Sequence, residues 1–215
     1  MKHGGTHLYL ALCLLVVLGT AAAHPTATSR SVVAKACGPE RVRVRSGDST
    51  QCIGVWRYLR RRPVRVPSLV PGAPCPADRP RGDLAVLATG IVGTAFGPGP
   101  VYPGLGSAHE RAEFSFYYPP PRTSGDYGSE WSGQKVMWIL RRGFAGPALV
   151  RGRQLDGPNE LRFDLGLVPS PERRLRGSGG HASSTRLRAP GCYAYQVDGL
   201  RFSYRIVFEA KLYPS

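Results

Sequence analysis

Two acidic side chains in one polar stretch are the best catalytic candidates of this 215-residue chain. Asp126 and Glu130 stand four residues apart, next to Tyr127 and Trp131, whose rings could stack on a sugar. Glycoside hydrolysis needs two such carboxyl groups across a sugar site. Two solvated acids of a surface loop explain the same residues more simply. We therefore assign no catalytic residue, and we keep a hydrolase acting on a cell-surface polymer as the alternative hypothesis.

Other catalytic and metal-binding signatures are missing from the sequence. Residues 177–181 contain a serine and a histidine but lack the strand–turn–helix context of a nucleophile elbow. His109-Glu110 begins like a zinc-protease helix, yet the second histidine of that motif is absent. No Cys-x-x-Cys spacing and no phosphate-binding loop occurs. We expect neither a metal nor a cofactor, and a non-enzymatic protein is the preferred hypothesis.

A cluster of arginines beside a tryptophan is the clearest candidate binding site. Guanidinium groups match phosphates and carboxylates in pairs, and an adjacent aromatic ring adds stacking. Such a cluster suits an anionic surface polymer, an acidic membrane face or extracellular nucleic acid. The alternative is an arginine-rich composition, because Arg outnumbers Lys 25 to 4 along the chain. The predicted polyanion-binding residues are Trp56, Arg57, Arg60, Arg61, Arg62 and Arg65.

A second group of polar residues falls on two predicted neighbouring strands and the turn after them. A buried charge needs a partner, so Arg151 or Arg153 with Asp156 explains part of this group as a structural ion pair. A ligand-binding patch is the functional alternative. The members of this predicted patch are Lys135, Arg151, Arg153, Gln154 and Asp156.

Composition and charge exclude several classes of protein. A hydrophobic content of 42% excludes a fully disordered chain, and 27 Gly with 20 Pro exclude a helical bundle. The formal net charge of +15 is uneven: residues 24–82 hold 12 basic and 3 acidic residues, whereas residues 83–215 hold 16 and 11. A secreted chain rarely meets nucleic acid, so we expect an anionic envelope polymer or another envelope protein as the partner, and no specific nucleic acid.

The N-terminus has the layout of a secretory signal peptide. Lys2 precedes an apolar run over residues 8–18, and small residues at 21–23 predict cleavage after Ala23. The run is shorter than the ~20 residues of a membrane span, so we expect no transmembrane segment in the mature chain. A secreted or extracytoplasmic envelope protein would keep four cysteines for up to two disulfides, and the sequence leaves all three pairings open. They are Cys37, Cys52, Cys75 and Cys192.

The elements that carry these residues are predicted to be strands. We divide the chain into a signal peptide (1–23), an irregular Arg/Pro-rich arm or linker (24–82) and an antiparallel β-sandwich (83–215). Alternation predicts an edge strand over 41–45, and prolines predict an extended linker over 63–82. Further strands are expected at 84–96, 113–118, 135–140, 148–151 and 161–164, and a mobile loop at 169–185. Asp198-Gly199 between two alternating runs predicts a terminal hairpin with a type I′ turn.

The entry to that hairpin carries a family resemblance. Pro190-Gly191-Cys192-Tyr193, followed by a strand, a turn and an apolar strand, resembles the last hairpin of immunoglobulin-like domains in secreted bacterial proteins. Residues 99–103, 133–138 and 146–157 are similar to a family of uncharacterised secreted bacterial proteins. The resemblance covers most of 83–215 and none of 24–82. It implies an immunoglobulin-like fold and an extracytoplasmic location, and it implies no reaction.

Overall fold

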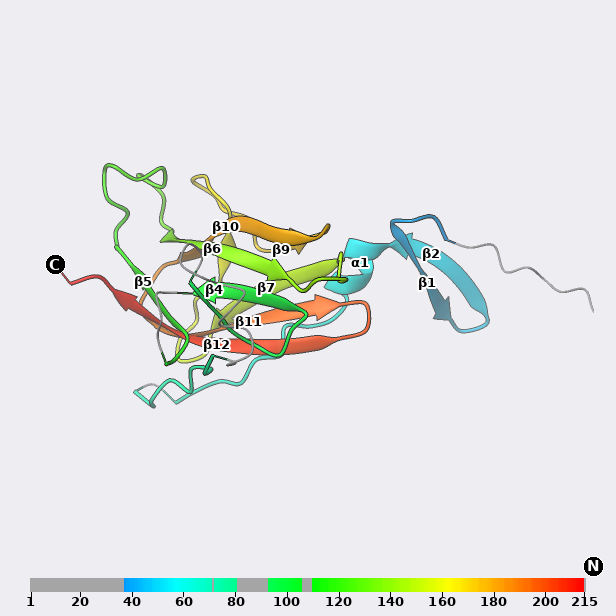
Figure 1. Cartoon of the computed structure of the whole chain (residues 1–215), viewed down its shortest axis with the longest axis horizontal. Helices are drawn as coiled ribbons and strands as arrows, with labels where there is room; N and C mark the ends of the chain where they lie inside the picture. The colour runs from blue at the N-terminus through cyan, green and yellow to red at the C-terminus, as the bar shows by residue number, and fades with distance from the viewer. Residues whose placement is uncertain (1–36, 71, 81–92, 106–109, 215) are drawn as a thin grey trace, which may run out of the picture. The chain divides into compact units, whose positions relative to one another are not determined.

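The computed structural model describes residues 37–70, 72–80, 93–105 and 110–214, and within them the chain is almost entirely β (Figure 1). The predicted signal peptide lies outside the described residues. Within these ranges no helix combines the length and the apolar character that a membrane span requires. The elements are β1 (Arg41–Ser46), β2 (Ser49–Gly54), α1 (Val55–Arg60), β3 (Thr94–Ala95), β4 (Val101–Leu105), β5 (Glu113–Phe116), β6 (Ser132–Leu140), β7 (Ala148–Gln154), β8 (Arg162–Phe163), β9 (Arg173–Leu175), β10 (Gly179–Leu187), β11 (Gly191–Gly199) and β12 (Ser203–Leu212).

Two five-stranded sheets share one apolar core, and we call them the two-sheet body. Their strand orders are β3-β4-β6-β10-β8 and β5-β12-β11-β7-β9, and the pairs are antiparallel except for β5 with β12. Trp138 of β6 meets Tyr195 of β11 edge-on, with ring centroids 5.0 Å apart. The Tyr195 hydroxyl lies 2.8 Å from that of Thr185 on β10, so a hydrogen bond also joins the sheets through the core.

Most of the predicted strands are confirmed. Where apolar residues alternate along such a run, they mark the side of the strand that faces the core. Strands β5, β6, β7 and β8 fall on the predicted runs 113–118, 135–140, 148–151 and 161–164. The predicted stretch 84–96 lies largely outside the described residues, and its end carries β3.

The prediction of a mobile loop at 169–185 is wrong. Strand β9 lies within this stretch, and β10 pairs with β6 over nine residues from Gly179 to Leu187. Its inward side chains include Ser183 and Thr185, which are small and polar and therefore gave no apolar alternation. The hydrogen bond between Thr185 and Tyr195 lets such a strand be buried.

The terminal hairpin is confirmed, but its turn differs from the prediction. Asp198 pairs with Ser203, and the Gly199 N–H donates to the Phe202 carbonyl at 3.0 Å, so Leu200 and Arg201 form the turn. Gly199 does not adopt the positive φ that a type I′ turn requires. Asp198, the residue before Gly199, is fully buried.

The predicted irregular arm is ordered structure in its described part. The predicted edge strand is β1, which forms a hairpin with β2, and the Cys37–Cys52 disulfide ties its base with a Cα–Cα distance of 5.8 Å. Helix α1 follows, and Val55 and Leu59 pack on Leu149 of β7. Cys37–Ser215 forms one compact unit, in which the arm packs on the sheets through small apolar clusters beside the main core.

Residues 62–70 and 72–75 cover the outer face of β11, which is why this strand is buried on both faces. The Cys75–Cys192 disulfide, with a Cα–Cα distance of 5.3 Å, joins the covering segment to the start of β11. Val66 packs against Leu155, Cys192 and Ala194, and the Leu69 N–H donates to the Leu155 carbonyl at 2.6 Å. The prolines of this segment favour an extended path without helix, and that path lies on the sheet.

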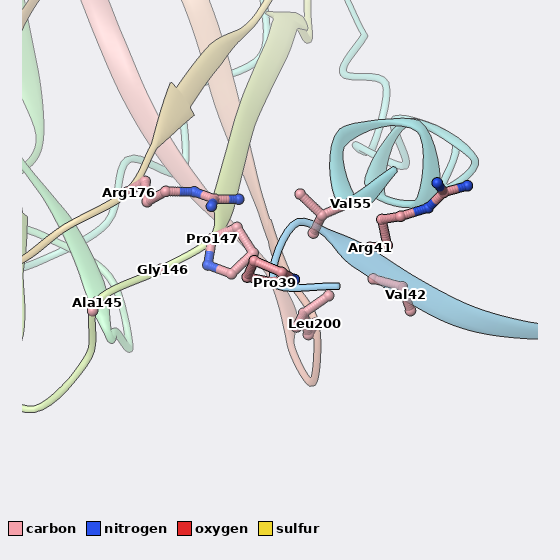
Figure 2. Close-up of a pocket in the computed structure, with 9 residues that line it drawn as sticks. All are labelled: Pro39, Arg41, Val42, Val55, Ala145, Gly146, Pro147, Arg176 and Leu200. Atoms are coloured by element: carbon pink, nitrogen blue, oxygen red, sulfur yellow. The ribbon is translucent and has the colours of Figure 1, made fainter. Parts of the chain in front are cut away.

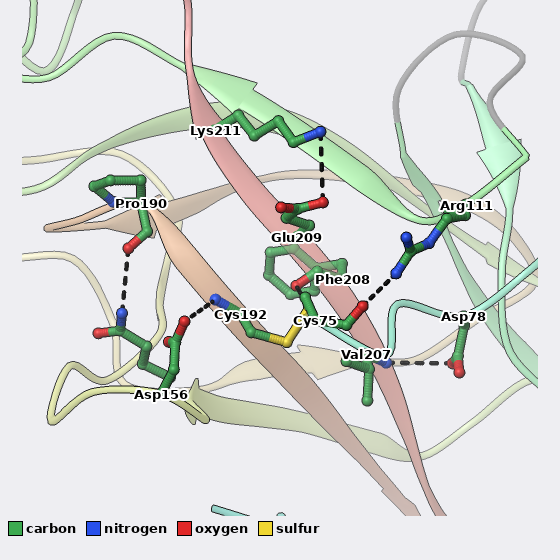
Figure 3. Close-up of a disulfide and its surroundings, with 11 residues drawn as sticks. Cys75, Asp78, Arg111, Asp156, Pro190, Cys192, Val207, Phe208, Glu209 and Lys211 are labelled. Atoms are coloured by element: carbon green, nitrogen blue, oxygen red, sulfur yellow. Dashed lines mark hydrogen bonds and ion pairs between the residues drawn. A yellow bond between two sulfur atoms is a disulfide. The ribbon is translucent and has the colours of Figure 1, made fainter. Parts of the chain in front are cut away.

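Figure 3 shows how this segment continues past the disulfide. The Asp78 N–H donates to the Val207 carbonyl at 2.9 Å, and the Val207 N–H donates to the Asp78 carboxylate at 3.2 Å. The Arg111 guanidinium donates to the Cys75 carbonyl. Burial raises the pKa of Asp78, and the hydrogen bond from Val207 opposes that rise. The segment is thereby attached to β12 as well as to β11.

Candidate functional site

Helix α1 presents the predicted arginine cluster, and its direction follows from a short apolar face. Val55 and Leu59 are four residues apart, so both point to β7 while Arg57 and Arg61 point outward. The Val55 N–H donates to the Glu40 carbonyl at 2.9 Å and fixes the start of the helix. The helix ends at Arg60, three residues before Pro63, which disfavours its continuation.

Three of the six predicted polyanion-binding residues make structural contacts, and Trp56 and Arg60 are the first two. The Trp56 ring lies beneath two guanidinium groups, those of Arg174 at 5.6 Å and Arg176 at 5.4 Å. Arg60 forms a bidentate pair with Glu172, with distances of 2.7 and 2.6 Å. The hydrogen bond from Arg60 lowers the pKa of Glu172 below its ordinary value. These contacts attach α1 to the strand β9 region.

Arg62 is also structural. Its Nη1 donates to the carbonyls of Gly199 and Phe202 at 2.7 and 2.6 Å, and its Nη2 donates to Leu200 at 3.0 Å. The guanidinium therefore satisfies three carbonyls of the β11–β12 turn. Loss of Arg62 would leave those carbonyls to water and free the segment that follows α1.

The remaining predicted arginines are exposed, as are arginines of the hairpin. Arg41 and Arg45 donate to the backbone carbonyls of Cys52 and Gly47, and Arg43 stands between them on the same face of β1. Among the described residues, no carboxylate pairs with any of five exposed arginines, which we call the outward arginines. They are Arg41, Arg45, Arg57, Arg61 and Arg65.

The second predicted patch is divided by the structure. Lys135 is exposed on β6, in the other sheet from Arg151 and Arg153, which lie on β7. Arg151 pairs with Asp198 at 2.7 Å, and not with Asp156 as the sequence suggested. Arg153 is exposed. These side chains do not converge on one ligand.

Gln154 and Asp156 instead hold the start of β11. The Cys192 N–H donates to the Asp156 carboxylate at 3.0 Å. The Gln154 amide donates to the Pro190 carbonyl at 3.2 Å and accepts from Asn159 at 2.6 Å. These bonds join the end of β7 and the loop after it to the entry of β11.

A buried polar network that sequence reasoning missed lies on the outer face of β11. The Asp198 carboxylate accepts from Arg151 at 2.7 Å, from the Ser203 hydroxyl at 2.7 Å and from the Gln196 amide at 2.9 Å. The Gln196 oxygen in turn accepts from the Arg65 N–H at 2.6 Å. Gln196 and Asp198 alternate within an otherwise apolar strand, and that pattern was the available signal that another segment covers this face.

The candidate catalytic acids are both paired with arginines. Asp126 lies 2.7 Å from Nη1 of Arg186, whose side chain is fully buried and which also donates to the Trp131 carbonyl. Burial lowers the pKa of Arg186, and the Asp126 charge opposes that change. Glu130 pairs with Arg188 at 2.6 Å.

The neighbouring aromatic ring is also occupied. Guanidinium groups lie over the Trp131 ring, that of Arg188 at 4.2 Å and that of Arg162 at 5.4 Å. A sugar would have to displace a cation to stack there. Asp126, Glu130 and Trp131 are all engaged by arginines of the fold. They are therefore less accessible to a substrate than the sequence pattern suggested.

A cleft of about 190 Å³ lies where the hairpin and α1 meet three loops of the two-sheet body (Figure 2). Most of its lining side chains are apolar, although polar atoms contribute more of its exposed surface than apolar atoms do, and Arg176 extends toward it. The lining residues are Pro39, Arg41, Val42, Val55, Ala145, Gly146, Pro147, Arg176 and Leu200.

Comparisons with known proteins assign nothing to these features. No family model, no curated protein and no solved structure matches this chain. Within the described ranges, no three His, Cys, Asp or Glu residues lie close enough together to hold a metal ion. The outward arginines and the cleft are therefore judged on their own geometry.

Proposed function

We propose that this protein is an extracytoplasmic, non-enzymatic binding protein of immunoglobulin-like architecture that attaches to an anionic envelope polymer. The observation that carries the proposal is the set of outward arginines, which are exposed and without a carboxylate partner among the described residues. Arg57 and Arg61 stand four residues apart and so share one face of α1, with Arg65 shortly after them.

Charge density supports a polymer as the ligand. Residues 37–65 contain eight arginines and only two acidic residues, Glu40 and Asp48. Such a surface attracts anions over about a Debye length, roughly 10 Å at 0.1 M salt. A polymer with repeated charges can engage several arginines at once and release counterions from each contact.

The compartment is supported by the cysteines and the N-terminus. Two disulfides are formed by the four cysteines of the predicted mature chain, and such bonds persist in oxidising compartments. The signal-peptide layout over residues 1–23 agrees with that location. The immunoglobulin-like class is supported by the resemblance of the terminal hairpin and by the two facing sheets.

Binding is better supported than hydrolysis. Asp126 and Glu130 both hold arginine partners, and the ring beside them is covered. Glycoside hydrolysis requires two carboxyl groups that reach the sugar, and carboxylates held by arginines are less available for that role.

The proposal is tested by affinity for dextran sulfate and for polyphosphate across a salt series. The test variant replaces Arg57, Arg61 and Arg65 with Gln, and the matched control replaces three other exposed arginines, Arg141, Arg142 and Arg205. Affinity should fall steeply between about 50 and about 500 mM NaCl, and the test variant should lose at least about tenfold more than the control.

Two results would contradict the proposal. One is binding to neither polymer at about 50 mM NaCl, which would favour a protein partner in the envelope. The other is an equal loss in the test and control variants, which would mean that net charge alone acts.

A further inference from the structure

We propose that the cleft beside α1 is a binding site for a small organic anion with a short aliphatic tail, of the alkanoate class. Of the outward arginines, Arg41 alone lines this cleft, and the ligand proposed here differs from the polymer that those arginines would bind. The cleft combines apolar lining side chains, a positioned cation and a small volume, and each of these bears on the choice of ligand.

Several separate parts of the chain line the cleft. Val42 comes from the hairpin and Val55 from α1, whereas Pro147, Arg176 and Leu200 come from three different loops of the two-sheet body. Loops that gather at one end of a two-sheet fold commonly carry its ligand sites, because the sheets hold them rigidly while their sequences vary.

The apolar wall has an exposed member that a ligand would cover. Leu200 stands at the tip of the β11–β12 turn with 42% of its surface exposed, although turns usually carry polar residues. Val55, which also lines the cleft, is already almost fully buried. An aliphatic tail would therefore remove apolar surface from water mainly at Leu200.

The cation of the cleft is held in position but weakly neutralised. The Arg176 guanidinium lies 5.4 Å from the Trp56 ring and 2.6 Å from the Glu40 carboxylate, and Figure 2 shows it extending toward the cleft. The Glu40 side chain is 67% exposed, and an ion pair so open to water is weak. A ligand carboxylate can therefore replace Glu40 on a guanidinium that Trp56 already orients.

Arg41 does not compete for this role. Its guanidinium donates to the Cys52 carbonyl at 2.6 Å, and Figure 2 shows it directed away from the cleft. One cation in an apolar cleft selects one anionic group, in contrast to a polymer with many charges.

The small volume of the cleft favours a ligand with a short aliphatic tail. The cleft measures about 190 Å³, whereas sites for drug-sized ligands are typically ~300–1,000 Å³. A chain of about six carbons with one carboxylate matches this smaller volume. Hexanoate is therefore the probe that we choose.

The experiment is a two-dimensional NMR titration of the ¹⁵N-labelled, disulfide-bonded protein with three probes. Hexanoate carries both the tail and the charge, hexanol lacks the charge, and acetate lacks the tail. Hexanoate should shift the amide signals of Val55, Ala145, Arg176 and Leu200 in a saturable way, and the other two probes should bind at least about tenfold more weakly.

Four variants make the test specific. Arg176→Gln should weaken hexanoate binding about tenfold, and Leu200→Ser should weaken it severalfold. Glu40→Gln should strengthen it, because the competing carboxylate is removed. Arg142→Gln, an exposed arginine of the β6–β7 loop that does not line the cleft, should leave the affinity unchanged.

The proposal is overturned if hexanoate causes no saturable shifts, or if hexanol binds as well as hexanoate. It is also overturned if Arg176→Gln and Glu40→Gln bind like the unmodified protein. The variant that replaces Arg57, Arg61 and Arg65 should keep its affinity for hexanoate, so the failure of polymer binding and the failure of this site are distinguishable.

Discussion

Each sheet of the body carries one buried arginine–aspartate pair on its outer face, but the two pairs are built in opposite ways. On β11 the carboxylate is the fully buried member: Asp198 is closed off, and its partner Arg151 keeps 14% of its side-chain surface exposed. On β10 the cation is the fully buried member, since Arg186 is closed off while Asp126 is 13% exposed.

Both pairs fasten an irregular segment to a sheet. Arg151 donates to the Arg62 carbonyl as well as to Asp198, and so attaches residues 62–65 to one sheet. Arg186 donates to the Trp131 carbonyl and pairs with Asp126, and so attaches residues 126–131 to the other. Much of the arginine excess therefore serves the fold, and only the arginines left outside such contacts are candidates for binding.

Disruption of the Arg151–Asp198 pair should cost more stability than disruption of the Arg186–Asp126 pair. Asp198→Ala removes the acceptor of three donors at a site closed to water, and loss of one partner of a buried pair costs ~3–5 kcal/mol. Urea unfolding measures the change. The control is Asp48→Ala in the exposed hairpin turn, which should change stability by less than ~0.5 kcal/mol. A loss below ~1 kcal/mol for Asp198→Ala would show that the network is not tightly packed.

The Cys75–Cys192 disulfide attaches the same segment covalently, and its loss should have the next largest effect on stability. Replacement of Cys75 and Cys192 by Ala opens a bridge between residues 117 positions apart and should cost ~2–4 kcal/mol. The matched variant replaces Cys37 and Cys52, whose separation is 15 residues. It should loosen the β1–β2 hairpin and leave proteolysis of residues 62–80 unchanged. Equal cleavage of 62–80 in both variants would contradict a local role for each bridge.

The second pair should be less costly to disrupt than the first. Arg186→Met leaves Asp126 within reach of water and the Trp131 carbonyl without its donor, so we expect a loss of ~2–3 kcal/mol in urea unfolding. Arg188→Met, which removes only an exposed partner of Glu130, should cost less than ~1 kcal/mol. If Arg186→Met is as damaging as Asp198→Ala, the two pairs do not differ in the way described.

The smallest effect concerns the attachment of α1 and depends on pH. The pKa of Glu172 is lowered by the hydrogen bond from Arg60, so its contribution is present above its ordinary pKa of 4.5 and is lost as pH falls through the lower folded value. Arg60 is 45% exposed, which limits that contribution to less than ~1 kcal/mol.

Glu172→Gln should therefore lower the melting temperature by a few degrees at pH 7, with the difference shrinking by pH 3. Glu110→Gln, at another exposed acid, is the control. A difference between Glu172→Gln and the unmodified protein that stays constant from pH 7 to pH 3 would contradict the pairing with Arg60.

What the sequence revealed was the local part of the fold. Alternation predicted β5 and the terminal hairpin, and an apolar run predicted β6, because the residues of each strand themselves carry its apolar pattern, whichever strand they pair with. It did not predict β10, whose inward Ser183 and Thr185 are polar, nor the turn at Leu200, because the burial of Asp198 depends on distant donors.

The candidate site was predicted in part for the same reason. Arg57, Arg61 and Arg65 are exposed as a polyanion site requires, but Arg60 and Arg62 have partners more than 100 residues away, Glu172 and the β11–β12 turn. A proline-rich segment has the same composition whether it is free or laid on a sheet. Contacts such as those of Cys75 and Val66 distinguish the two cases.

The most direct measurement is native-state hydrogen exchange of the amides of Arg65, Leu69 and Asp78. Their N–H groups donate to Gln196, to the Leu155 carbonyl and to the Val207 carbonyl. If residues 62–80 are part of the fold, these amides exchange at least about a hundredfold more slowly than in an unstructured chain, and Asp198→Ala accelerates Arg65 first. Exchange at the unstructured rate in the oxidised, unmodified protein would contradict the attachment of this segment.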